Sequence, residues 1–71
     1  MKTYSASFVP TSSGYMGQLL DWPEVITEGQ TVEECRGMLQ DTLHEMILAY
    51  RQMNKPIPEP ERLVEQISAE V

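Results

Sequence analysis

The chain has 71 residues, of which 41% are apolar, and its five Lys and Arg face eleven Asp and Glu for a formal charge of −6. A chain this short forms one domain, residues 1–71, and buries only about 60% of its unfolded surface, so we expect oligomerisation to add burial. The acidic balance argues against nucleic-acid binding, which needs Lys and Arg to displace phosphate counterions, and suits a basic partner.

The protein is expected to stay in the cytoplasm. Cys35 is the only cysteine, so the chain forms no internal disulfide, and a reducing compartment is expected. No apolar run approaches the roughly 20 residues of a membrane span, and no apolar signal segment follows Lys2. We predict a soluble, cytoplasmic protein with no membrane contact.

Three strands are predicted in the first part of the chain. Side chains alternate in character over residues 3–10 and 15–22, which is the period of a half-buried strand. The turn residues 10–14 between these segments predict an antiparallel hairpin. Pro23 then turns the chain into a short third strand over residues 25–28.

The residues from Gly29 to Cys35 predict a tight turn and the start of a helix. Gly29 permits a backbone conformation that other residues resist, and Thr31 is the predicted N-cap. Glu34 stands where its carboxylate can close a capping box with Thr31. The helix is predicted over residues 32–53, with an apolar stripe that faces the sheet: Cys35, Leu39, Thr42, Leu43, Met46, Tyr50 and Met53.

Other helix residues fall outside this stripe. Met38, Ile47 and Leu48 indicate a second apolar patch that a monomer would leave in water. Gly37 costs about 1 kcal/mol relative to alanine inside a helix. A close approach to another backbone is one explanation of Gly37, which the sequence alone does not decide.

A linker is predicted over residues 54–62, because Pro56 cannot continue the helix. Residues 63–71 fit either an alternating strand or a short helix with apolar residues four apart. We favour a strand, parallel to an earlier one through a right-handed crossover. The predicted fold class is therefore α+β with the order β-β-β-α-β.

The sequence offers no pattern that is typical of catalysis or metal binding. His44 is the only histidine and has no strong ligand four residues away on either side, and Cys35 lies on the buried stripe. We expect no catalytic residue, no cofactor and no metal. Trp22, before Pro23, fits either the core or a protein interface.

Four short strings stand out for their order and spacing along the chain: Gly14-Tyr15, Asp21-Trp22-Pro23, the run from Thr27 to Cys35, and Ile57-Pro58-Glu59-Pro60. Together they resemble the HicB antitoxin family over about residues 1–60. The chain departs from the family pattern at Leu20, Glu24 and Gly37, where the family favours a proline, a glycine and a better helix former.

The resemblance implies a partial RNase H-like fold, with three antiparallel strands, one long helix on one face and a fourth strand. RNase H enzymes hold two metal ions with carboxylates, and the segment 3–10 has none, so no nuclease activity is expected. The resemblance also implies an antitoxin that binds a small basic HicA-type toxin, which cleaves messenger RNA. No DNA-binding module fits in the residues after Pro60, so no direct DNA or RNA binding is expected.

These observations predict a non-enzymatic antitoxin that works as a homodimer or homotetramer. The alternatives are an orphan interaction or scaffold domain without a toxin and, third, a metal-dependent nuclease, which would need a carboxylate cluster that the sequence does not present. The predicted partner-binding residues are an apolar anchor and the acidic residues near the helix start and the sheet rim: Trp22, Glu24, Glu28, Glu33 and Asp41.

Overall fold

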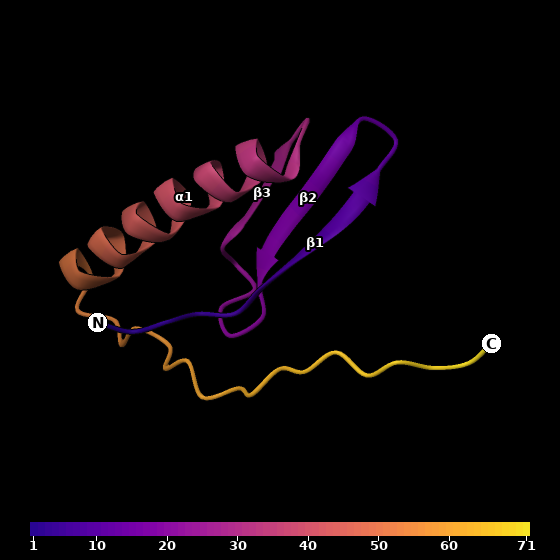
Figure 1. Cartoon of the computed structure of the whole chain (residues 1–71). Helices are drawn as coiled ribbons and strands as arrows, with labels where there is room; N and C mark the ends of the chain where they lie inside the picture. Colours follow the sequence, from indigo (N-terminus) through magenta and orange to yellow (C-terminus); the bar gives the residue numbers. More distant parts are fainter.

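The structure is a computed structural model that describes all residues from 1 to 71, and it consists of one sheet and one helix. The three strands are antiparallel in the order β1-β2-β3, and the helix lies over one face of the sheet (Figure 1). The predicted α+β class and the antiparallel arrangement of the first three strands are confirmed. The elements are β1 (Ala6–Thr11), β2 (Gly14–Leu19), β3 (Ile26–Gly29) and α1 (Val32–Gln52).

The first two strands are shorter than the alternation of side chains predicts, and hydrogen bonds at their ends explain why. Residues 3–5 lie before β1. The Ser5 carbonyl still accepts from the Leu20 N–H at 2.8 Å, but the Ser5 N–H donates to Asp21 Oδ2, at 2.9 Å. At the end of β2 the chain turns, and the Trp22 carbonyl accepts from the Val25 N–H at 2.9 Å. Pairing places Phe8 opposite Gly17, on the face that α1 covers.

Two glycines allow the start of α1 to pack directly on the sheet. A Cβ on Gly17 would lie 2.8 Å from Cys35 Sγ, and a Cβ on Gly29 would lie 2.8 Å from the Cys35 backbone nitrogen. Gly29 has no positive φ, so close packing, rather than the special backbone conformation expected from the sequence, is what requires it. Gly37 has nothing within 4 Å of the Cβ position, so no close contact within this chain explains it.

The predicted N-cap of the helix is confirmed. Thr31 has extended backbone angles, and its Oγ1 accepts from the Glu34 N–H at 3.1 Å. The Glu34 side chain makes no return bond to Thr31, so only half of the capping box forms. The helix ends one residue earlier than predicted, at Gln52, and Asn54 follows with a φ of 56°, a left-handed conformation that asparagine tolerates.

The core lies between α1 and the end of the sheet where β2 finishes. Cys35 is fully buried, as predicted, whereas Met53 at the end of the predicted stripe is 55% exposed. Ile47 packs against the core instead of joining an outer patch, while Met38 and Leu48 do lie on the surface. The core cluster consists of Leu19, Trp22, Val25, Leu39 and Tyr50.

The chain after the helix forms neither helix nor strand. Tyr4 Oη donates to the Pro58 carbonyl at 2.7 Å, and Lys2 pairs with Glu59, so this part of the linker is held beside the N-terminal residues. Residues 63–71, which were predicted as a fourth strand, pair with no other strand and extend away from the sheet (Figure 1). A strand needs a neighbouring ladder for its N–H and C=O groups, and this segment has none.

Candidate partner-binding surface

A shallow hollow opens at the end of the sheet where the β1–β2 turn, the end of β3 and the start of α1 meet. Its volume is about 260 Å³. Antiparallel pairing brings these segments together, because Tyr15 at the start of β2 stands opposite Gly29 at the end of β3. We call it the polar hollow, and its lining residues are Thr11, Ser13, Tyr15, Glu28, Gly29, Gln30 and Glu34.

The charge of the polar hollow is negative. Glu28 and Glu34 line it, no Lys or Arg does, and neither carboxylate takes part in an ion pair. Both residues are exposed, so water solvates these carboxylates in the free protein. Hydroxyl and amide groups surround them, which suits the ammonium or guanidinium group of a partner's side chain.

The start of α1 explains why carboxylates gather near the polar hollow. Glu33 and Glu34 occupy the first helical turn, where the positive end of the helix dipole stabilises negative charge. Their presence there therefore has a structural reason of its own. Glu28 lies on β3, outside the helix, and no helix-capping role accounts for it.

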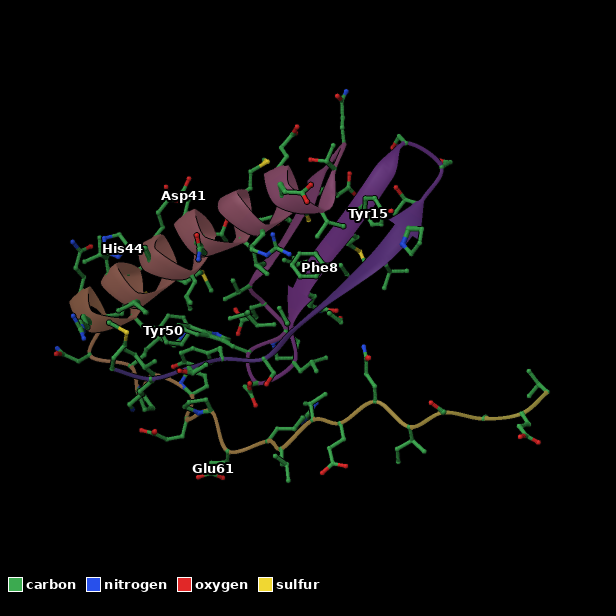
Figure 2. The ribbon with its side chains drawn as sticks, viewed as in Figure 1. Phe8, Tyr15, Asp41, His44, Tyr50 and Glu61 are labelled. Carbon is green, nitrogen blue, oxygen red and sulfur yellow. The ribbon has the colours of Figure 1, made fainter.

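The structure brings some of the predicted site residues together and separates others. Glu28 lines the polar hollow, and Glu33 is exposed in the adjacent first turn of α1. Asp41 points into solvent from the outer face of α1, about two turns further along (Figure 2). Glu24 lies far from all three, near the C-terminal end of α1, where it bonds to Tyr50.

Sequence reasoning missed part of this hollow. Glu34 was assigned only to the cap, and Thr11 and Tyr15 were not considered as binding residues. The signal that would have found them is the hairpin itself, because its turn and the residues flanking it must lie at one end of the sheet.

Trp22 is buried, which corrects its assignment as an apolar anchor for a partner. It is 2% exposed, and its ring lies edge-on to Tyr50 with 4.8 Å between ring centroids. The centroid of the Tyr4 ring lies 6.3 Å from that of Trp22. Trp22 is therefore part of the hydrophobic core, and a docked partner cannot reach its ring.

The surroundings of Trp22 tie the end of α1 to the loop between β2 and β3. Tyr50 Oη donates to Glu24 Oε1 at 2.9 Å, and Lys55 Nζ lies 4.7 Å from the centre of the Tyr50 ring. We call Tyr4, Trp22, Glu24 and Tyr50 the aromatic clamp. Within it, Trp22 Nε1 is buried without a hydrogen-bond partner, which typically costs about 1–3 kcal/mol.

The titratable and nucleophilic side chains elsewhere are dispersed. No group of three or more His, Cys, Asp or Glu side chains is arranged to hold a metal ion. His44 is exposed on α1 (Figure 2). Cys35 is fully buried, and its nearest polar contacts are with Thr27, at 3.7 Å. No helix is both long and apolar enough to span a membrane.

The outer face of α1 combines apolar and acidic side chains. Met38 is 45% exposed and Leu48 is 47% exposed, and Asp41 and Glu45 lie between them at helical spacing. Asp41 on this stripe points away from the sheet (Figure 2), and all four side chains are exposed.

The family model for UPF0150-like proteins matches residues 2–58. The chain belongs to the UPF0150-like family. This family is related to toxin–antitoxin systems. The match covers all three strands and α1, and it ends at Pro58, where the chain leaves the folded body. No curated protein gives a significant match.

Proposed function

We propose that this UPF0150-like protein is a HicB-like antitoxin that binds and neutralises a small, basic, mRNA-cleaving toxin of the HicA type. The observation that carries the proposal is the polar hollow, where Glu28 and Glu34 are exposed and unpaired in a chain with a formal charge of −6. A toxin that binds RNA needs a basic surface, and an acidic surface of this kind can cover it.

Neutralisation in this proposal is steric and electrostatic, and the antitoxin makes or breaks no covalent bond. Glu28 and Glu34 in the polar hollow, and Glu33 in the adjacent first turn of α1, receive basic side chains of the toxin. Asp41 extends the acidic field along the outer face of α1. Complementary charge speeds the encounter of the two proteins, and the docked antitoxin excludes RNA from the toxin.

We also propose that the antitoxin self-associates as a homodimer or homotetramer in the cytoplasm, with a partial RNase H-like arrangement and no direct contact with DNA or RNA. Support comes from the small core, since only seven of 71 residues are buried. Large apolar side chains such as Leu63 and Ile67 remain in water, which is typical of surfaces that another chain covers.

The decisive experiment measures binding between this protein and the small basic protein encoded in the neighbouring reading frame, by isothermal titration calorimetry at two salt concentrations. The double variant Glu28→Lys, Glu34→Lys should weaken binding by at least tenfold, and higher salt should weaken the wild-type complex. A growth assay with the co-expressed toxin should show loss of rescue by the same variant.

The matched control is Glu61→Lys, Glu70→Lys, which changes the net charge equally at positions that do not line the polar hollow. It should bind almost as tightly as the wild type. An equal loss in both double variants would mean that net charge alone governs binding. Absence of any complex with a basic neighbouring protein would overturn the antitoxin proposal.

The second candidate is an orphan interaction domain without a toxin. The exposed Met38 and Leu48 favour it, because an apolar stripe on α1 does not require a basic partner. The neighbouring reading frame distinguishes the two functions: a short basic companion supports the antitoxin, and its absence favours the orphan domain. For an orphan domain, the double variant Met38→Ser, Leu48→Ser should abolish binding of its partner. The double variant Glu28→Lys, Glu34→Lys should leave that binding intact.

A further inference from the structure

An apolar groove lies between α1 and the free edge of the sheet. The helix packs over β2 and β3, and β1 is an edge strand. Phe8 of β1 lies on the α1 side of the sheet (Figure 2), where it lines the groove beside α1. The volume of the groove is about 340 Å³. Its apolar lining consists of Tyr4, Ala6, Phe8, Leu19, Leu39 and Leu43.

The groove has the opposite charge to the chain as a whole. Its charged lining residues are Arg36 and Lys2, of which Lys2 pairs with Glu59, and no carboxylate lines it. The Arg36 guanidinium lies 5.6 Å from the centre of the Phe8 ring, so this cation is placed directly over the apolar floor. An occupant that is apolar with a negative charge therefore fits this groove.

The C-terminal segment, residues 63–71, has this chemistry. In an extended chain, alternate residues share a face, and one face carries Leu63, Ile67 and Val71, which are 85%, 88% and 123% exposed, together with Ala69. The only charged residue on that face is Glu65. The other face carries Val64 and three polar residues.

We propose that residues 63–71 of a second copy of this chain add as a strand to the free edge of β1, with the Leu63–Ile67–Val71 face in the groove and Glu65 near Arg36. The added strand supplies ladder partners to an edge that has none and removes large apolar side chains from water. Pro10 lacks an N–H, so the pairing covers β1 and the residues just before it as far as Val9.

The geometry of the linker favours a second copy over the chain's own groove. Pro58 and Glu59 are held against Tyr4 and Lys2, and Pro60 stiffens the next step of the chain. Beyond this anchor the segment extends away from its own sheet (Figure 1), and none of its residues lines the groove of its own chain. Reciprocal exchange between two copies fills both grooves with one two-fold arrangement.

This inference gives the proposed self-association an interface and does not depend on the toxin. Its test measures the oligomeric mass and the crosslinking of the purified protein, whereas the test of antitoxin function measures binding to the toxin. Either proposal can fail while the other stands.

The first measurement is sedimentation equilibrium of the full chain. The wild type should be a dimer, and Ile67→Asp should raise the dimer dissociation constant by at least tenfold. The matched control, Ser68→Asp, places the same charge on the other face of the same segment and should leave the dissociation constant within threefold. Arg36→Glu should also weaken the dimer, and Arg36→Glu with Glu65→Arg should recover it.

The second measurement is disulfide crosslinking of a variant that combines Ala6→Cys and Ile67→Cys, with Cys35 remaining buried in the core. Oxidation should give a covalent dimer on a non-reducing gel. A covalent monomer would overturn the proposal in favour of the chain's own segment. A monomeric wild type, or a dimer that Ile67→Asp does not weaken, would also overturn it. Far-ultraviolet circular dichroism verifies that each variant keeps α1.

Discussion

The two ends of the sheet carry similar acidic residues in opposite circumstances. At the aromatic clamp, Glu24 accepts a hydrogen bond from Tyr50 and fixes the end of α1 to the loop after β2. At the polar hollow, Glu28 has no protein partner and is exposed to solvent. One carboxylate is therefore used within the fold, and the other is available to a second molecule.

The comparison teaches that exposure alone does not identify a recognition residue. Glu24 and Glu28 are both on the surface of the same acidic chain. They differ in the element that each one faces: Glu24 faces a tyrosine of the core, and Glu28 faces an open hollow. Substitutions at the clamp should therefore change stability, and substitutions at the hollow should change binding.

The largest effect is expected at the centre of the clamp. Trp22→Ala should lower the free energy of unfolding by about 3–5 kcal/mol, because it leaves a cavity beneath Tyr50. Urea denaturation followed by circular dichroism measures this loss. Trp22→Phe is the control: it keeps a ring and removes the unpaired indole N–H, so it should cost much less. Equal losses in the two variants would contradict the cavity as the cause.

A second comparison concerns two glycines near the start of α1, Gly29 at the end of β3 and Gly37 within the helix. Gly29→Ala should destabilise the fold by about 1–3 kcal/mol, because its Cβ would lie 2.8 Å from the Cys35 backbone nitrogen. Gly37→Ala should stabilise it by up to about 1 kcal/mol, because that position is open and alanine favours helix. Thermal unfolding of both variants checks the opposite signs, and a loss in both would refute the packing argument.

A smaller effect is expected from the hydrogen bond of the clamp. Tyr50→Phe keeps the ring against Trp22 and removes the bond to Glu24, so it should cost about 0.5–1.5 kcal/mol. A double-mutant cycle with Glu24→Ala, measured by urea denaturation, isolates the coupling. Additive losses from the two single variants would show that the pair does not interact.

The smallest effect on stability is expected at the polar hollow. Glu28→Gln should change the free energy of unfolding by no more than about 0.5 kcal/mol, since the side chain is exposed and has no protein partner. The same variant should slow association with a basic partner, measured by stopped-flow fluorescence. A large loss of stability would mean that Glu28 has a structural role like that of Glu24.

Several features of the fold were predictable because their causes lie within a few residues. The start of α1 depends on Thr31 and the Glu34 N–H, three positions apart, and the burial of Cys35 follows from helical spacing. The first hairpin follows from alternation and from the turn that joins its strands. Residues 63–71 form no strand within the single chain, because alternation describes a strand's faces but does not determine which ladder the strand joins.

The amino-acid sequence by itself determined the order of the three strands and the helix, the helix start and the excess of negative charge, since each depends on composition or on neighbours along the chain. Only the tertiary structure decided that Trp22 is buried, that Glu24 serves the fold and that Glu28 lines a hollow. These outcomes depend on how α1 lies across the sheet. That placement brings Tyr50 to a loop 26 residues away in sequence, a distance that no local pattern spans.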